Sequence, residues 1–426
     1  MQSGKPLCAK SKGKAKGAEL KKTVIGILMI TLLFAGCTSE ADVNDPFAYY
    51  SVLPREVFAT GIEFYAAVRG GNEQQALSEM SALMDDLNSD MSLTLSSSAL
   101  STFNALGFDE EPTIDYESER VKISAETYAV VTRAQEIYAE TGGIFNIAVR
   151  PLTALWCVDN EGLSEYSPFG TVQPPIPSFE EVTMALSHCD LTHLHTAEEG
   201  GAYYLYKTDP KLQIDLGAIA KGYAADRCAQ IARANGVESA LINISGNICV
   251  VGEWYHPQKK AYTRWDVGVN APRPRGGFAG EALALSLPAD CTVVTSGDYR
   301  RYIVGLVGDT PLYLSHIVSG KSGLPQGVRY NGSAYVQETD FVVSAVIFTD
   351  DSTTADAYAT AACLMPYEEA IAFLQAHHTG GILFTEDKRI AFIGITERDE
   401  SGRAYVTQKD AYGGYRAYTV EAYALE

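Results

Sequence analysis

The stretch QIDLGAIAKGYAADRCAQIARANGV, residues 213–237, places an acid and a lysine where a predicted strand meets a predicted helix. Asp215 follows a short apolar run, and Lys221 stands just before the helical pattern. The residues between them have almost no side-chain bulk, so backbone atoms there are approachable from outside. One charge of each sign beside an open backbone suits a polar ligand that carries phosphate, alone or with a metal ion.

A second candidate site lies in STTADAYATAACL, residues 352–364. Asp356 and Thr360 are four residues apart, which places a carboxylate and a hydroxyl on one face of a helix. Both groups offer oxygen to a hard cation. On spacing alone, a solvated aspartate and a threonine bonded to its own backbone explain the pair more simply. The small residues around the pair favour a site, because they allow another group to approach closely.

Two loops at the ends of predicted strands hold further polar groups. SGDYRRY, residues 296–302, presents Ser296 and Asp298, although a turn in which the aspartate bonds its own backbone explains this pattern as well. SHIVSGKSGLP, residues 315–325, presents His316 in a loop, where catalytic groups are often found, whereas a lone histidine is more often structural. The sequence contains no G-x-S-x-G, Walker A or H-E-x-x-H motif.

The elements that must position these residues are helices and strands interspersed without a regular βαβ order. This order favours an α+β fold over a doubly wound sheet. No linker divides the chain, so we expect one large domain after the leader. The predicted helices are 73–91, 125–140 (capped by Ser124), 222–236, one from 352, and 367–378; the predicted strands are 238–252, 264–271, 282–289, 291–299, 340–350 and a hairpin at 380–395, and 159–181 is a predicted loop.

The charge of the chain is uneven. The whole chain of 426 residues has a net charge of −20, but residues 1–36 contain seven lysines and one acid. The remainder has 26 basic and 52 acidic residues, a net charge of −26. So acidic a body excludes nucleic acid as the expected partner, because contacts to phosphate backbones need clustered lysine and arginine.

Residues 1–36 have the pattern of an export signal: a lysine-rich start and then the apolar run TVIGILMITLLFAG, which is short for a membrane span. Phe34-Ala35-Gly36-Cys37 resembles the lipobox of bacterial lipoproteins, with Phe34 in place of the usual smaller aliphatic residue. We therefore expect a lipid on Cys37, a tether over 37–54 and a catalytic domain over 55–426, at the extracytoplasmic face of a bacterial cell membrane. Ordinary signal cleavage, with Cys37 incidental, is the alternative.

The six cysteines of the body show no C-x-x-C spacing, and several lie in apolar surroundings. This pattern predicts buried free thiols rather than a zinc site or a disulfide framework. They are Cys157, Cys189, Cys228, Cys249, Cys291 and Cys363.

Four of these motifs and a fifth, NISGNI, occur together in the order found in one family. DLGAIAKGYAAD, NISGNI, SGDYRRY, HIVSGKSG and ADAYAT resemble the segments of the FAD:protein FMN transferase (ApbE) family, and the resemblance covers about residues 55–400. It implies a single mixed α+β domain of the T-fold-like flavin-transferase type. Members of the family are often exported lipoproteins, which agrees with the expectation for Cys37.

The resemblance implies roles for individual residues. It assigns FAD contacts to Asp215 and Lys221, and a candidate catalytic base to His316. It implies three magnesium ligands, which are the carbonyl of Ala218 and the side chains of Asp356 and Thr360. The remaining expected FAD-binding residues are Phe145, Asn146, Ile147, Ser296, Asp298 and Ile317.

The activity implied by the family is magnesium-dependent transfer of the FMN part of FAD to a threonine or serine hydroxyl of an exported acceptor protein, with release of AMP. Two alternatives stay open. Water as the nucleophile would make the protein an FAD pyrophosphatase, and loss of chemistry would make it a lipoprotein that only binds FAD.

The chain departs from the family pattern at several positions. Ser319-Gly320 replaces an Asp-Pro pair after His316, and Asn146 replaces an aspartate. Thr94 stands where an aromatic residue is common, and Ala59 stands where a methionine is usual. Loss of a stacking ring weakens FAD binding by about 1–3 kcal/mol if stacking on bases is a fair guide. We expect altered FAD affinity rather than loss of activity, because both metal-binding side chains are kept.

Overall fold

The computed structural model describes residues 49–52, 55–57, 62–107, 120–159, 173–270, 272, 281–298, 301–395, 406–408 and 419–425. A ten-stranded sheet forms its centre, in the order β1-β3-β7-β8-β13-β18-β19-β20-β22, with β2 also paired to β3. Only the pair β20 and β22 is parallel. The strands of the large sheet are β1 (Tyr50–Ser51), β2 (Arg55–Val57), β3 (Ile62–Arg69), β7 (Ser239–Ile244), β8 (Asn247–Val251), β13 (Thr292–Gly297), β18 (Val342–Thr349), β19 (Gly380–Thr385), β20 (Arg389–Ile393) and β22 (Thr419–Tyr423).

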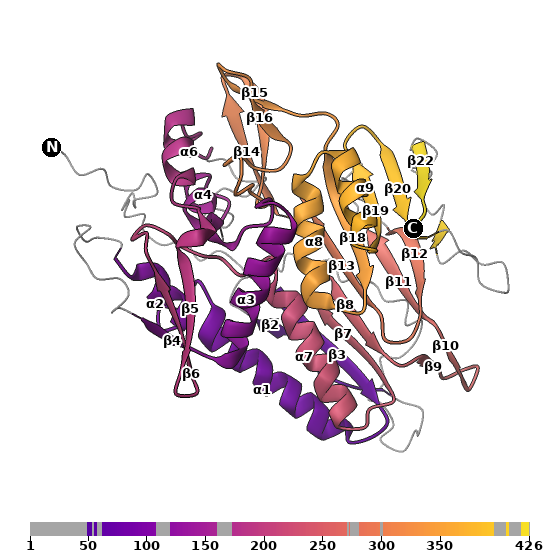
Figure 1. Cartoon of the computed structure of the whole chain (residues 1–426). Helices are drawn as coiled ribbons and strands as arrows, with labels where there is room; N and C mark the ends of the chain where they lie inside the picture. The colour runs from indigo at the N-terminus through magenta and orange to yellow at the C-terminus, as the bar shows by residue number, and fades with distance from the viewer. Residues whose placement is uncertain are drawn as a thin grey trace, which may run out of the picture.

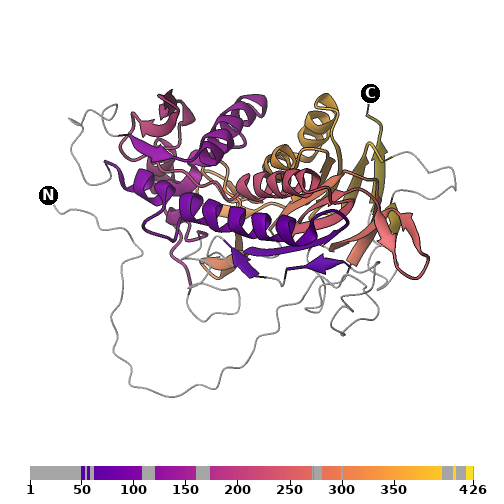
Figure 2. The ribbon, with the colours of Figure 1, turned by 90° about the horizontal axis from the view of Figure 1, so that it is seen from below.

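Helices α1, α7 and α8 cover one face of this sheet, with α3 packed outside them (Figures 1 and 2). The largest core cluster fills this layer, because alternate residues of each strand point toward the helices. The helices are α1 (Glu73–Met91), α2 (Ala99–Ala105), α3 (Ala125–Glu140), α4 (Arg150–Leu155), α6 (Phe179–Leu186), α7 (Ala220–Ala234), α8 (Ser352–Leu364) and α9 (Tyr367–Ala376), with 3-10 turns at Ile147–Val149 and Leu191–His193.

The other face of the sheet packs against a small sheet of β11, β12 and β21, which encloses a second core cluster. A third cluster lies where α4 and α6 meet β14 to β17, at the top of Figure 1. The strands outside the large sheet are β4 (Val121–Ile123), β5 (Leu194–Glu199), β6 (Ala202–Lys207), β9 (Trp254–His256), β10 (Ala261–Thr263), β11 (Trp265–Asn270), β12 (Glu281–Leu287), β14 (Tyr302–Val307), β15 (Thr310–Ser315), β16 (Val328–Tyr330), β17 (Tyr335–Gln337) and β21 (Val406–Gln408).

The expected α+β fold is confirmed, and the element predictions that fall on described residues hold with small shifts. Residues 160–172 of the predicted loop lie outside the described residues. Helix α1 has the predicted bounds, and the Ser124 side chain accepts a hydrogen bond from the backbone N–H of Thr127 at the start of α3, as its capping role requires. Helix α7 begins and ends two residues earlier than predicted. The end of the predicted loop is already helical, because a capping box between Ser178 and Glu181 begins α6 at residue 179. All six cysteines of the body are free thiols.

The folded part begins earlier than expected. Tyr50 and Ser51, which we assigned to the tether, pair with β3 as strand β1, because their backbone groups satisfy the edge of that strand. The leader, Cys37 and most of the tether lie outside the described residues. Among the residues that the structure describes, no helix is long and apolar enough to cross a bilayer.

Candidate functional site

The centre of the candidate site is the contact between Asp356 of α8 and the first turn of α7. The Asp356 side chain is fully buried. Its carboxylate accepts hydrogen bonds from the Lys221 ammonium at 3.0 and 3.1 Å and from the backbone N–H of Gly222 at 3.1 Å. Lys221 also donates to the carbonyl oxygen of Gly217 at 2.5 Å. No side chain of α7 itself caps this helix, so Asp356 supplies both the hydrogen-bond acceptor and the negative charge that a helix N-terminus favours.

Gly222 allows α7 and α8 to approach closely enough for this contact. A Cβ atom at this position would lie 2.1 Å from the carbonyl oxygen of Ser352 and 2.9 Å from the Cβ of Asp356. Both distances are far below van der Waals contact, and the first involves backbone that cannot rotate away. The glycine of the AKG segment is therefore required by helix packing.

Gly222→Ala should separate the two helices, although alanine normally favours a helix over glycine. We expect a loss of about 3 kcal/mol in the free energy of unfolding, in the range found for overpacked sites. Chemical denaturation measures this loss, and Gly308→Ala is the matched control. Gly308 has a positive φ of 62° but no atom within 4 Å of its built Cβ, so it reports backbone strain alone. Gly308→Ala should cost only about 1–2 kcal/mol, the strain of a left-handed residue. A Gly222→Ala variant as stable as the wild type would contradict the packing argument.

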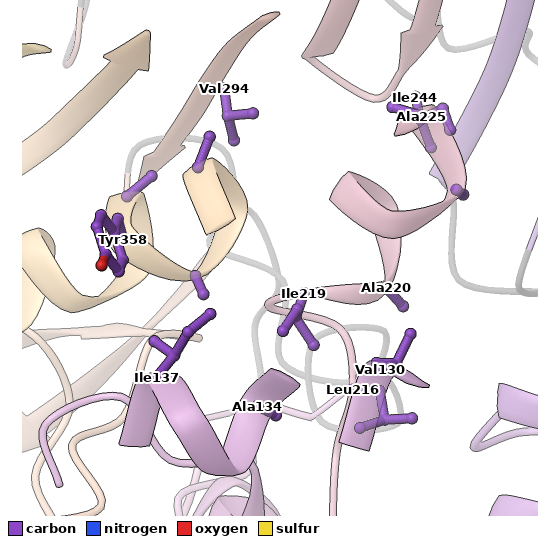
Figure 3. Close-up of a cluster of buried hydrophobic side chains, with 14 of the residues drawn as sticks. Val130, Ala134, Ile137, Leu216, Ile219, Ala220, Ala225, Ile244, Val294 and Tyr358 are labelled. Atoms are coloured by element: carbon purple, nitrogen blue, oxygen red, sulfur yellow. The ribbon is translucent and has the colours of Figure 1, made fainter. Parts of the chain in front are cut away.

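Asp215 lies on a loop that is held from both sides. The Asn104 side chain donates to the carbonyl of Ile214 at 2.9 Å and accepts from its backbone N–H at 2.8 Å. The backbone N–H of Asp215 donates to the carbonyl of Ile147 at 2.7 Å. Leu216 and Ile219 anchor the same loop in the core beneath it, next to α3 (Figure 3). The loop thereby joins the segment 145–147 to the start of α7.

His316 contacts Arg301 through the backbone. The Nδ1 atom of His316 lies 2.9 Å from the carbonyl oxygen of Arg301, and because a carbonyl only accepts, Nδ1 carries the proton. The other ring nitrogen, Nε2, is then the basic one. Burial, together with the nearby positive charges of Arg301 and Lys221, lowers the pKa of His316 to about 3, so the ring is neutral at ambient pH.

Arg301 also links His316 to the Asp215 loop. Burial lowers the pKa of the Arg301 guanidinium, and the carboxylate of Asp215 acts against this shift. Asp215, Lys221, Arg301 and His316 thus lie within electrostatic range of one another, with two cations beside one neutral histidine. Such a group of charges suits an anionic ligand.

Thr360 meets Ser296 at the end of β13. The two hydroxyl oxygens are 3.3 Å apart, one helical turn beyond Asp356. Asp298 follows two residues later, is 5% exposed, and donates its backbone N–H to the carbonyl of Val343. A pocket opens beside this strand end, but it is lined by Thr295 and Gly297, so it lies on the sheet face away from α8.

The four residues expected to line the flavin are buried in the domain. Phe145 and Ile147 are each 1% exposed and Ile317 is 6% exposed, all within the largest core cluster. The Asn146 side chain donates to the carbonyl of Cys189 and accepts from the backbone N–H of Ala148, both at 2.8 Å. A ligand would therefore reach Phe145 and Ile147 mainly through their backbone atoms.

The oxygen groups expected to hold magnesium are of the kinds that this ion binds, and both carboxylate oxygens of Asp356 accept from the Lys221 ammonium. Asp356 supplies one buried carboxylate, Thr360 a hydroxyl one turn later, and Ala218 a partly buried carbonyl next to Gly217. Among the described residues, no cluster of three or more His, Cys, Asp or Glu side chains is arranged to hold a metal ion. Magnesium often binds through one or two carboxylates together with substrate phosphates, so these groups suit an ion that arrives with a diphosphate.

The sequence of this chain matches a known family over most of its length. Residues 59–384, which are 326 of the 426 residues, match the ApbE family. The chain belongs to this family. The resemblance drawn from the five motifs is thereby confirmed.

Relatives in the ApbE family include proteins of several bacteria. The FAD:protein FMN transferase of Treponema pallidum is 30% identical over 387 residues, which are 88% of this chain and 94% of the relative. The protein of the same name in Escherichia coli K12 is 25% identical and is covered to 89%. The flavin transferase ApbE of Vibrio cholerae has a similar structure, with a TM-score of 0.59, 25% identity, and coverage of 79% of this chain and 94% of that one.

Several residues that organise the site in this ApbE-family chain were not predicted. Arg301 belongs to the quoted SGDYRRY motif, but only its position beside His316 and Asp215 reveals its charge as part of the site. No sequence pattern predicted the role of Asn104, because its partner Ile214 is 110 residues away.

Asp226 was quoted within its motif without a role. Its carboxylate accepts from the backbone N–H groups of Ser352 and Thr353, at 2.9 and 2.8 Å, and from the Thr353 hydroxyl at 2.5 Å. Burial raises the pKa of Asp226 to about 6 despite these hydrogen bonds. An acid of α7 therefore fixes the first turn of α8, and with it the position of Asp356 one turn later.

Proposed function

We propose that this protein is an FAD:protein FMN transferase that uses magnesium and modifies a threonine or serine of an exported acceptor protein. The observation that carries the proposal is the buried Asp356–Lys221 contact at the start of α7, flanked by Arg301 and His316. This arrangement combines a metal-binding carboxylate, two cations for a diphosphate and a neutral base. The names of the relatives support the same reaction.

Individual residues of the chain have distinct roles in the proposed transfer of FMN. Lys221 and Arg301 would hold the negative charge of the FAD diphosphate. The acceptor hydroxyl forms a bond to the FMN-side phosphorus, while the bond from this phosphorus to the bridging oxygen breaks and AMP leaves. Nε2 of His316 accepts the hydroxyl proton, since Nδ1–H is held by the Arg301 carbonyl. The bound diphosphate makes this possible, because it offsets the charges of Arg301 and Lys221 that lower the pKa of His316. Magnesium held by Asp356, Thr360 and Ala218 would neutralise charge that develops on the diphosphate.

The test is mass spectrometry of a flavinylation-competent acceptor after incubation with this protein, FAD and magnesium. A mass gain of one FMN on a threonine or serine, with AMP released in equal amount, is the expected result. Release of AMP and FMN without an adduct would make the protein an FAD pyrophosphatase. Bound FAD without either product would make it a flavin-binding protein.

We also propose that the protein is tethered to the outer face of the cell membrane by a lipid on Cys37. The lipobox-like sequence before Cys37 supports this proposal. Cys37→Ser in the full chain should move the protein from the membrane fraction to the soluble fraction and abolish incorporation of labelled fatty acid. Cys157→Ser is the control, because Cys157 is a buried thiol of the domain. An unchanged distribution of the Cys37 variant would contradict the anchor.

A further inference from the structure

The β9–β10 hairpin projects past the end of the large sheet, at the lower right of Figure 1. Between Glu253 and Asp266 its sequence, WYHPQKKAYTRW, contains three basic residues and no acid, in a chain with a net charge of −20. Lys259 and Lys260 at its tip are exposed, and Tyr262 is 44% exposed. Positive charge and aromatic rings are thus gathered on one protruding element of an acidic protein.

The base of the hairpin is fastened to the domain. The Arg69 guanidinium lies 4.0 Å from the centre of the Tyr255 ring and donates to the Tyr262 hydroxyl at 2.6 Å. The Tyr262 hydroxyl donates to the carboxylate of Glu238 at 3.0 Å. The base of the hairpin is therefore held in a defined position, and the exposed Lys259 and Lys260 lie at the tip beyond it.

The chain enters the fold beside this hairpin. The Tyr49 hydroxyl accepts from the backbone N–H of Tyr255 at 2.9 Å and contacts Ser239 at 2.6 Å, and the Tyr49 ring packs on Trp265 at 5.9 Å. Only twelve positions separate Tyr49 from Cys37. Twelve extended residues span at most about 40 Å, so a chain anchored at Cys37 keeps the hairpin close to the lipid surface.

The candidate site lies at the other end of α7. Lys221 is in the first turn of this helix, whereas Asn235, which follows its last turn, receives the backbone N–H of Asn72 near the start of β7 and the hairpin. Fifteen helical residues place the two ends about 22 Å apart. A membrane contact through the hairpin would therefore leave the site about one helix length away from that contact.

We propose that the β9–β10 hairpin is a docking surface for a bilayer of anionic lipid. Lys259 and Lys260 contact the negative headgroups, and Tyr262 lies at the interface level, where tyrosine is enriched in membrane proteins. The surface orients the catalytic domain on the membrane and is independent of flavin chemistry. It goes beyond the proposed transferase function and can fail while that function holds.

The test is sedimentation of the unlipidated chain 38–426, which keeps every described residue, with two kinds of vesicle. One kind is phosphatidylcholine alone, and the other contains equal parts of phosphatidylglycerol. We expect binding to the anionic vesicles only, weakened by 0.5 M salt, because screening shortens the range of exposed charges. Each lysine near an anionic surface contributes about fivefold to partitioning, so K259E/K260E should bind at least about 25-fold more weakly.

The matched control is K122E/K211E, which makes the same change in net charge at two exposed lysines of other surfaces. It should bind like the wild type, and both variants should keep the wild-type melting temperature. Absence of wild-type binding to anionic vesicles would overturn the proposal, and so would equal losses in the two variants. If the wild type does not bind vesicles but K259E/K260E slows FMN transfer to the acceptor, the hairpin contacts the acceptor protein and the membrane proposal is wrong.

Discussion

Asp356→Asn is expected to lower the rate of FMN transfer by about 10²- to 10³-fold, the usual loss when one group that stabilises transition-state charge is removed. The amide keeps an oxygen that can accept from the Gly222 N–H and the Lys221 ammonium. It lacks the negative charge that a magnesium ion requires. Activity should therefore fall much more than stability, and the loss should be partly relieved at high magnesium concentration.

Two variants complete this experiment. Asp356→Ala removes both hydrogen-bond acceptors and leaves the Gly222 N–H without its partner, which should cost a further 1–3 kcal/mol or so in the free energy of unfolding. Asp350→Asn makes the same chemical change at an exposed position just before α8 and should leave transfer unchanged. Full transfer by Asp356→Asn at limiting magnesium would show that this carboxylate holds no metal.

His316→Asn should lower transfer by about 10²- to 10⁴-fold, the typical contribution of a general base. Its side-chain amide can still donate to the Arg301 carbonyl, so the loop should keep its position while the base is lost. FAD affinity, measured by fluorescence titration, should change little. A variant that lost affinity and kept its turnover rate would assign His316 to binding alone.

The pH profile separates a base from a structural histidine. The working form is neutral, and the pKa of about 3 keeps His316 in this form at every pH above roughly 4. The value of kcat/KM, which reports the free enzyme, should therefore show no acidic limb near pH 6.5. A bound diphosphate offsets the charges of Lys221 and Arg301, so the acidic limb of kcat should lie at higher pH. An acidic limb of kcat/KM near pH 6.5 that is absent in His316→Asn would contradict the lowered pKa of His316.

The elements of this protein could be predicted from local signals. Helix α1 follows from apolar residues at spacings of three and four, and α3 follows from a serine cap and a terminal glycine pair. The sequence shows that the side chains in the segment 215–222 are small, but it shows only part of the reason. Gly222 is small because the Ser352 carbonyl of another helix touches it, and no local pattern reports a contact over such a separation.

The candidate site could be predicted residue by residue but not as a geometry. The motifs indicated Asp356 as a metal ligand and Lys221 as an FAD contact, yet nothing in the sequence shows that the two side chains bond to each other across 135 residues. The Arg301 carbonyl accepts from the His316 ring, and the Asn104 side chain bonds the backbone of Ile214, so each contact joins two loops and leaves no residue pattern. The flavin-lining residues expected at 145–147 lie in the core, because the same apolar side chains also serve packing.

The loop that carries Asp215 is ordered by its own domain. Asn104 bonds both backbone groups of Ile214, the Ile147 carbonyl holds Asp215, and the buried Lys207 ammonium donates to the carbonyl of Leu212 at 2.7 Å. FAD therefore need not immobilise this loop when it binds. The entropy of ordering, typically about 0.5–1.5 kcal/mol for each side chain fixed at a binding interface, was already lost during folding. A larger share of the intrinsic binding energy then remains for affinity and for alignment of the diphosphate with the incoming acceptor.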